Sequence, residues 1–294
     1  MLRGTLALLA AAPIRAATEL LHVQLAPINS RHAQVLAMLS QKRAQNSLYT
    51  VLDVGGSMGG WSAPVATHLM DFNPPVATGR FSIFRVGTIN DAEEWKDVLE
   101  HVTAHGRFDF CICTHTLEDI AMPQLVVKMI NRVSKAGFFA TPSKYIELKR
   151  GVETGPEGPS RFRGYIHHRW LFSLVGGTWT AFPKVNFLDA EPAYDALVGD
   201  GTPATAHAEL SFFWSGRISL HPINQDYLGP SYDAVRQFYA ASLLSDDCDE
   251  WIRRHAPRRG EVGTLKNRSR VSKPHEAQKA LSNTTGGWWR QFFG

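Results

Sequence analysis

Residues 52–60 read LDVGGSMGG, and this stretch decides the fold class because it joins an apolar run to a glycine-rich loop. The apolar run begins at Leu48 and ends in Asp53, after which the chain has four glycines and a serine within seven residues. Glycine permits positive φ and lets a ligand contact the backbone. The pattern predicts either a tight strand-to-helix turn without a ligand or a nucleotide-binding loop at the carboxyl end of a first strand.

The segments around this loop alternate between the strand and helix periods. A helix is expected over 30–45, before the first strand at 48–54. Further strands are expected at 67–72, 81–87, 108–114 and 138–142. Only the residues GWSAPVA separate the glycine loop from the second strand, so the connection there is too short for a long helix.

Two helices are expected between the later strands. The first has Asp91 as its N-cap with Glu94 three residues on, and the second begins at Pro123 and ends at Gly137. The order of elements predicts an α/β fold with a doubly wound, mostly parallel Rossmann-like sheet.

The pattern changes after residue 150. The runs RWLFSLV and TWTAF are joined by Gly176-Gly177, which predicts an antiparallel hairpin, and ELSFFWSGRISL predicts another antiparallel strand. We therefore expect a core at 19–185 and a C-terminal extension of antiparallel strand and helix at 186–257. The glycine- and proline-rich stretch at 151–164 is expected to be a mobile loop, and 258–294 a basic, flexible tail.

The positive charge lies in this C-terminal segment. The net charge of the chain is +4, but residues 251–294 alone carry +8, so residues 1–250 carry −4. A basic end of this kind indicates contact with RNA or another acidic partner, or a solvated end without a partner.

Cysteine content and the N-terminus bear on the compartment. Three cysteines are too few for a disulfide framework, which favours a reducing compartment such as the cytoplasm or the mitochondrial matrix. Residues 1–18 contain two arginines and no acid, so they are expected to be a mitochondrial or secretory targeting segment or an ordinary first helix. No apolar run is long enough to span a membrane.

Distinctive residues follow the ends of four predicted strands, the edge where ligands bind in open α/β sheets. The first strand is followed by Asp53-x-Gly55-Gly56-Ser57-x-Gly59, the second by Asp71, the third by Asn90 and Asp91, and the fourth by Thr114 and His115.

The segment after the fourth strand, Thr114-His115-x-Leu117-Glu118, and the later Arg132-Val133-x-Lys135-x-Gly137 carry a family resemblance. Together with the glycine loop they resemble the class I S-adenosylmethionine-dependent methyltransferases, in the branch with Ser/Thr-His-x-Leu-Glu after strand four. The resemblance covers about residues 48–148. It implies a methyltransferase that uses S-adenosyl-L-methionine, with a methyl acceptor that the sequence does not name.

The resemblance also implies roles for single residues. Asp53, Gly55, Gly56, Ser57 and Gly59 would approach the methionine part of the cofactor, and Asp71 would accept hydrogen bonds from the ribose hydroxyls. Asn90 or Asp91 would lie near the adenine, and Thr114 and His115 near the sulfonium. The chain departs from the family where Ser57 replaces a glycine and where Thr88 follows Gly87 in place of aspartate.

Candidate catalytic residues lie after the fifth strand. In GYIHHRW, His167 or His168 would serve as a general base; on a strand they would point to opposite sides, so at most one would face the pocket. The alternative is a surface pair without a role. Lys144 and Glu147 are further candidates, since the loop ending Gly-Gly-Trp is also similar to that of RNA 2′-O-ribose methyltransferases, which use a Lys-Asp-Lys-Glu set.

The sequence permits two other interpretations. Cys111, Cys113 and His115 alternate along one strand and would suit a soft metal, but small residues filling a buried strand explain them better, and no metal site is expected. The lack of a long helix between the glycine loop and the second strand, together with the basic tail, also fits a catalytically inactive methyltransferase-like binding or assembly factor, associated with RNA or the ribosome. Cofactor affinity separates this alternative from the enzyme.

Overall fold

A computed structural model describes residues 20–57, 59–71, 82–199, 202–223 and 230–244. The N-terminal segment 1–18 and the basic tail 258–294 lie outside the described residues. The described part contains one sheet of seven strands and smaller sheets of three and two strands. Within these ranges, no helix has both the length and the apolar character needed to cross a membrane.

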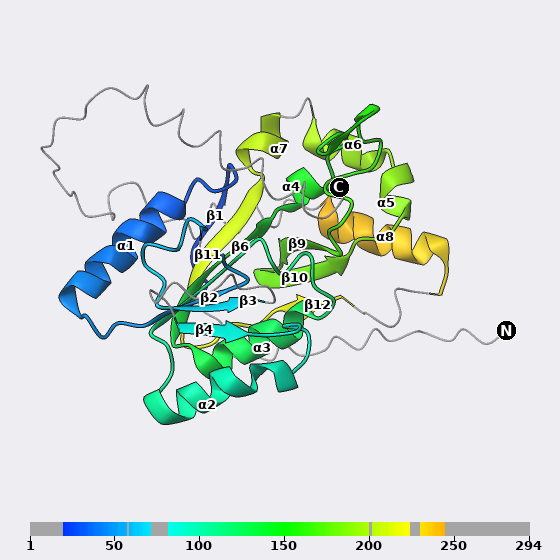
Figure 1. Ribbon diagram of the computed structural model, residues 1–294. Helices are drawn as coiled ribbons and strands as arrows, with labels where there is room; N and C mark the ends of the chain where they lie inside the picture. The colour runs from blue at the N-terminus through cyan, green and yellow to red at the C-terminus, as the bar shows by residue number, and fades with distance from the viewer. Residues whose placement is uncertain (1–19, 58, 72–81, 200–201, 224–229, 245–294) are drawn as a thin grey trace, which may run out of the picture. The chain divides into compact units, whose positions relative to one another are not determined.

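The large sheet has the order β1-β11-β6-β5-β2-β3-β4 (Figure 1). Its strands are β1 (Leu20–Ala26), β2 (Val51–Val54), β3 (His68–Asp71), β4 (Ser82–Arg85), β5 (Phe110–Thr114), β6 (Ala136–Pro142) and β11 (Glu209–Ser215). The five strands from β6 to β4 run parallel, while β11 is antiparallel to both of its neighbours. The chain moves outward from β2 to β4 and then returns to β5 and β6, so the order reverses between β2 and β5. The sheet is doubly wound, as the sequence predicts.

Helices cover both faces of this sheet (Figure 1). Helix α1 (His32–Gln45) buries Val35 and Leu39 in the cluster that contains Phe110 and Ile112 of β5. The 3₁₀ turn η1 (Glu93–Trp95), α2 (Lys96–His105) and α3 (Pro123–Val133) pack on the opposite face. Alternate residues of β5 therefore belong to different cores. Cys111 and Cys113 lie on the α2/α3 face as buried free thiols, as predicted for small residues in a covered strand.

The predicted hairpin is confirmed. It consists of β9 (Trp170–Val175) and β10 (Thr178–Pro183), joined by Gly176 and Gly177 at φ +55° and +76°, and β12 (His221–Pro222) adds a third strand. Trp179 of β10 lies 5.1 Å from Phe139 and 4.9 Å from Phe212, measured between ring centroids. The hairpin therefore packs its aromatic side chains on the large sheet.

The remaining helices of the described residues, of which α4 precedes the hairpin and the others follow it, surround a separate core. They are α4 (Lys144–Glu147), α5 (Phe187–Ala190), α6 (Ala193–Val198), α7 (Thr202–Ala206) and α8 (Tyr232–Leu243). Buried residues of α8 and of the hairpin, such as Tyr239 and Phe182, share this third cluster with Leu148. The stretch expected to be a mobile loop contains the small hairpin of β7 (Thr154–Gly155) and β8 (Gly158–Pro159).

Four local predictions are wrong. The edge strand β1 was not expected, and β2 begins at Val51, three residues after the predicted start at Leu48, which is 82% exposed. Helix α3 ends at Val133, and Gly137 lies inside β6, where a Cβ would come within 2.5 Å of the Trp214 indole nitrogen. Glu94 caps the backbone N–H of Gly87 at 2.7 Å and so does not complete a capping box.

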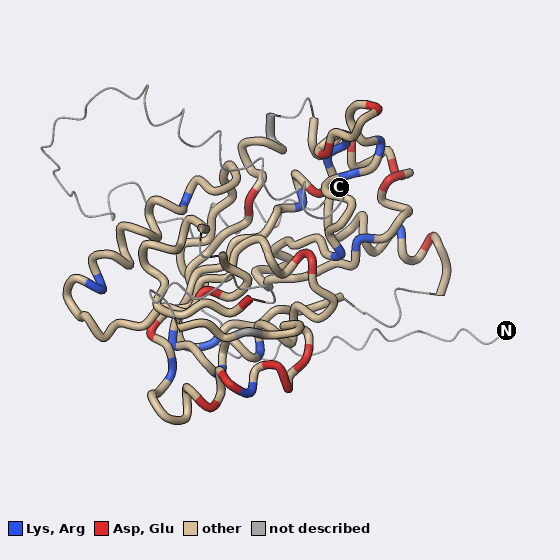
Figure 2. The backbone as a smooth tube through the Cα atoms, viewed as in Figure 1, with Lys and Arg blue, Asp and Glu red and all other residues tan. Residues whose placement is uncertain are grey.

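Acidic and basic side chains are interspersed along the described part of the chain, and several acidic positions lie among the strands (Figure 2). Asp53, Glu118 and Glu209 are buried. Buried carboxylates need partners to remain charged, so their surroundings are the first place to look for a site.

Candidate cofactor edge and histidine cluster

The ends of three neighbouring strands bring the predicted cofactor residues to one edge. Register pairs Asp53 of β2 with Ile112 of β5 and with Leu69 of β3. The strands run parallel, so the glycine loop, Asp71 and Thr114 all follow at the same carboxyl edge. This edge lies at the point where the strand order reverses, the position of ligand crevices in such sheets.

Two glycines of the loop are required by close contacts. Gly55 has φ +76° and donates its N–H to the Met70 carbonyl at 2.9 Å, and a Cβ there would lie 2.4 Å from Thr116 Oγ1. At Gly56 a Cβ would lie 2.0 Å from a carboxylate oxygen of Asp53. Gly59, in contrast, has open space around it. The first two glycines pack the loop against its own strand end and against the segment after β5.

Asp53 lies beneath this loop. Its carboxylate accepts a hydrogen bond from Ser62 and is covered by Gly56. Burial raises the pKa of Asp53 to about 7, and the nearby charge of Asp71 adds to the rise. Asp53 therefore supports the loop from below, and Asp71, at the end of β3, is less buried. Ser57 closes the following turn by accepting the N–H of Gly60 at 2.9 Å.

His115 lies at this edge of the sheet between two acidic side chains. Its backbone has φ +49°, which is uncommon for a residue other than glycine. Its Nε2 lies 3.0 Å from Glu209 Oε2, and its Nδ1 lies 3.5 Å from Glu118 Oε1. Burial alone would lower the pKa of His115, but the two carboxylates outweigh it and raise the pKa to about 10. His115 is therefore an imidazolium at neutral pH.

A second histidine stands close by in the opposite protonation state. His32 of α1 stacks on Trp61 with ring centroids 3.8 Å apart, and Trp61 Nε1 donates to Thr114 Oγ1 at 3.4 Å. Burial lowers the pKa of His32 to about 4, so its ring is neutral. Within the described ranges, His32 Nε2, Glu118 Oε2 and Glu209 Oε1 are buried without a hydrogen-bond partner. Unpaired buried polar atoms of this kind mark places where a ligand can bind.

Asn90 and Asp91 shape the connection between β4 and η1. Asn90 Oδ1 accepts the N–H of Met122 at 2.9 Å, which ties this connection to the residue before α3. Asp91 Oδ1 accepts the N–H of Glu93 at 3.0 Å. Contact of either residue with an adenine ring stays a prediction.

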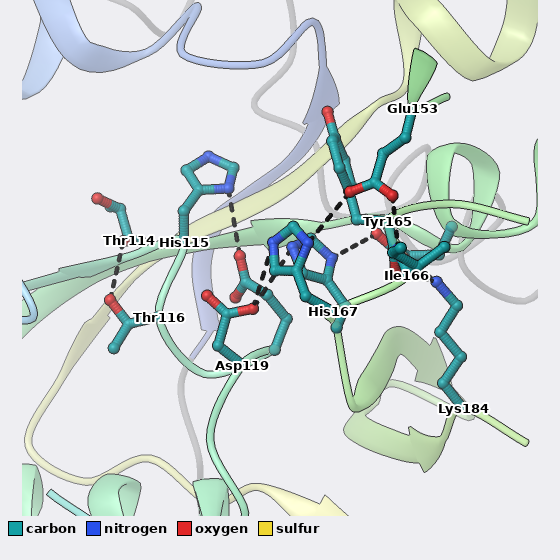
Figure 3. A network of polar contacts seen from close by, with 12 residues as sticks. Thr114, His115, Thr116, Asp119, Glu153, Tyr165, Ile166, His167 and Lys184 are labelled. Atoms are coloured by element: carbon teal, nitrogen blue, oxygen red, sulfur yellow. Dashed lines mark hydrogen bonds and ion pairs between the residues drawn. The ribbon is translucent and has the colours of Figure 1, made fainter. Parts of the chain in front are cut away.

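The two adjacent histidines lie in a turn before β9, so the expectation that they are on a strand and point to opposite sides is wrong. Their ring centroids are 4.4 Å apart, and both face Asp119 (Figure 3). His168 Nδ1 lies 2.7 Å from Glu147 Oε1. Burial would lower the pKa of His168, but Glu147, with the nearby Glu118 and Asp119, reverses this and raises it.

The other two candidate catalytic residues have different surroundings. Lys144 is buried, and its Nζ donates to the carbonyl of Leu243 at 3.0 Å, at the end of α8. Glu147 also accepts from Lys184 Nζ at 2.8 Å and so belongs to the histidine cluster. A cavity of about 570 Å³ borders this cluster and is lined by Glu147, His168 and Lys184 together with the apolar Phe162 and Ile166.

Several residues of these networks carried no local signal. Glu209 contacts His115 across 94 residues of sequence, and Glu153 contacts His167 from the stretch expected to be a mobile loop. Trp61 was read only as part of a loop motif. Sequence spacing does not assign Glu209 to His115, because the two residues lie two strands apart in the sheet. The burial of Glu209 at the start of β11 is apparent only after β11 has been placed in the sheet.

Comparison with known proteins gives distant structural similarities. No protein-family model and no curated protein matches the chain. A Lactococcus lactis protein described as a hemolysin has 13% identity and a TM-score of 0.31, over 74% of this chain and 100% of that one. S-adenosylmethionine-dependent methyltransferase structures from Mesorhizobium loti and Listeria monocytogenes have 10% and 11% identity and TM-scores of 0.30 and 0.31. They cover 56% and 61% of this chain and 90% and 98% of their own. Similarities at this level assign neither a family nor an activity.

Proposed function

We propose that this protein is an S-adenosylmethionine-dependent methyltransferase that binds its cofactor at the carboxyl edge of β5, β2 and β3. The observation that carries the proposal is the convergence of the glycine loop, Asp71 and the Thr114-His115 segment at the reversal point of the sheet. These are the residues on which the resemblance to class I methyltransferases rests.

The electrostatics of the edge support a cationic ligand. His115 carries one positive charge, and the carboxylates of Glu118 and Glu209 flank it. Two acidic side chains therefore lie beside one imidazolium, and acidic surroundings favour a cation over an anion. A sulfonium is a cation, and Asp71 would add an acceptor for the two ribose hydroxyls.

The chemistry assigned to the edge is transfer of a methyl group. When bound, S-adenosylmethionine would supply the methyl group: the acceptor's nucleophile would form a bond to the methyl carbon as the carbon–sulfur bond breaks, with S-adenosylhomocysteine as the leaving group. The nucleophile's proton passes to a base, for which His167 and His168 are the candidates. The adjoining cavity has the size of a small-molecule site, and we assign it to the acceptor.

Cofactor binding tests the proposal directly. Titration of S-adenosylhomocysteine into the full-length protein should give micromolar affinity, and Asp71→Ala should weaken it by about 10-fold to 100-fold because a charge-assisted pair of hydrogen bonds is lost. Glu100→Ala is the matched control, since Glu100 lies on the exposed side of α2 in a surface pair with Lys96. Absence of binding at millimolar ligand would contradict the proposal and favour a binding or assembly factor.

A further inference from the structure

The two histidines named above as candidate bases also have the geometry of metal ligands, and a ring whose Nε2 bound an ion would not accept the nucleophile's proton. His167 Nε2 and His168 Nε2 lie 3.8 Å and 3.6 Å from the same oxygen, Oδ1 of Asp119. One ligand atom from each of these three residues lies within 4.8 Å of the others. Asp119 follows β5, and the two histidines lie in the turn before β9. Two separate parts of the chain therefore supply the group, as Asp119 and His167 show in Figure 3.

The distances suit a shared ion. In a tetrahedral site with bonds of about 2.1 Å, two ligand atoms stand about 3.4 Å apart. The two contacts to Asp119 exceed this by a few tenths of an ångström, which side-chain rotation can close. Two imidazoles and one carboxylate form the ligand set of catalytic zinc sites, in which water or substrate takes the remaining position.

The outer nitrogen of each ring is already held by a carboxylate. His168 Nδ1 lies 2.7 Å from Glu147 Oε1, and His167 Nδ1 lies 3.1 Å from Glu153 Oε1. Glu153 is itself fixed, because its second oxygen accepts the N–H of Ile166 at 3.2 Å. Histidines that bind metals show this arrangement, in which the carboxylate sets the tautomer and leaves Nε2 for the ion.

Charge and access also favour a cation. Four carboxylates, those of Glu118, Asp119, Glu147 and Glu153, surround the rings, and Lys184 is the one ammonium bonded to this group within the described ranges. The side chains of Asp119 and His167 are 43% and 42% exposed, while that of His168 is 7% exposed. A bound ion would therefore rest on a buried histidine and face solvent on its other side.

We propose that Asp119, His167 and His168 bind a divalent transition-metal ion of the zinc class, with at least one coordination position open. The ion would polarise an oxygen-bearing ligand at that position. The site does not depend on the methyltransferase proposal, since metal affinity is measured in the absence of cofactor.

The test uses the full-length protein, stripped of metal with a chelator and titrated with zinc sulfate. Asp119→Asn and His167→Gln should each lose one equivalent of zinc bound at micromolar concentration, while the control His221→Gln, at an exposed histidine of β12, should match the wild type. Glu153→Gln keeps all three ligands and should weaken binding by about 10-fold to 100-fold.

Equal zinc stoichiometry in the wild type, Asp119→Asn and His167→Gln would overturn the proposal and leave the cluster as histidines hydrogen-bonded to carboxylates. A second measurement covers variants that fail to fold. Addition of cobalt(II) to the wild type should shift and broaden the imidazole NMR signals of His167 and His168 ahead of those of His221, and unshifted signals would also overturn it. Both measurements are made without S-adenosylhomocysteine, so a failure of this proposal is distinguishable from a failure of the methyltransferase proposal.

Discussion

Gly55→Ala is expected to destabilise the protein for two reasons that can be separated. The first is backbone conformation, since φ is +76° and the left-handed region costs a residue other than glycine about 1–2 kcal/mol. The second is steric, because the new Cβ would lie 2.4 Å from Oγ1 and 2.6 Å from Cγ2 of Thr116. Overpacking of this kind costs about 1–3 kcal/mol. The expected loss in the free energy of unfolding is therefore about 2–5 kcal/mol.

Urea unfolding followed by circular dichroism measures this loss, with Gly59→Ala as the matched control. Gly59 lies in the same loop, and an added Cβ there meets no atom within 4 Å. We expect its substitution to change the free energy of unfolding by less than about 0.5 kcal/mol, as surface substitutions usually do.

Thr116→Ala separates the two causes. Alone, it removes the hydrogen bond from Thr116 Oγ1 to the carbonyl of Thr114, 3.0 Å long, and should cost about 0.5–1.5 kcal/mol. In that background the two closest atoms are gone and only the Cβ of residue 116, at 3.1 Å, remains near the new methyl group. Gly55→Ala should then cost mainly the conformational part, so the double mutant should show a favourable coupling of about 1–3 kcal/mol. Equal costs for Gly55→Ala and Gly59→Ala, or a cost of Gly55→Ala that Thr116→Ala does not reduce, would refute the packing of this loop.

Three further outcomes are expected. The pKa of Asp53 is raised to about 7 in the folded state, so the protonated carboxyl stabilises the fold at about pH 4 and this stabilisation is lost as the pH rises to 7. In urea unfolding over that range, the free energy of unfolding of the wild type should fall by up to about 4 kcal/mol relative to that of Asp53→Asn. Because the pKa of His115 is raised to about 10 in the folded state, the resulting stabilisation is complete below about pH 6.5 and is lost as the pH rises to about 10. Glu209→Gln should therefore lower that pKa in an NMR titration and destabilise the fold by about 1–3 kcal/mol at pH 7. Arg163→Met should cost about 3–5 kcal/mol in calorimetry, because the buried guanidinium donates to three backbone carbonyls and pairs with Asp195; a loss below 1 kcal/mol would show that water replaces it.

The parallel half of the sheet could be predicted because its signals are local. Apolar runs of strand length alternate with helical periodicity, and Gly176-Gly177 carries the turn chemistry of a two-residue hairpin in two adjacent residues. The glycine loop and Thr114 were predicted to lie close together because the carboxyl ends of parallel strands meet at one edge of the sheet, and this prediction needed no knowledge of individual contacts.

The remaining parts depend on long-range pairing. Strand β1 has a mixed burial pattern and owes its place to pairing with β11, nearly two hundred residues later in the chain. The glycine at 137 predicts a helix end because glycine often has that role, but the close approach of Trp214 and of the Cys111 carbonyl to β6 explains it. The predicted direction of the His167 side chain is wrong because residues 166 and 167 form a turn before β9. Side chains point alternately to opposite faces only along a strand.

The two candidate sites are joined through one short segment. Glu118 faces His115 at the cofactor edge, and the next residue, Asp119, faces the paired histidines. The Glu118 carbonyl accepts the N–H groups of Arg169 and Trp170 at 2.7 Å and 3.3 Å, so the turn that carries the histidines is hydrogen-bonded to the same residue that holds His115. A displacement of this segment would move an acid in both sites at once. We therefore expect the two candidate sites to be coupled, and zinc titration with and without S-adenosylhomocysteine measures this, since equal zinc affinities would show that the sites are independent.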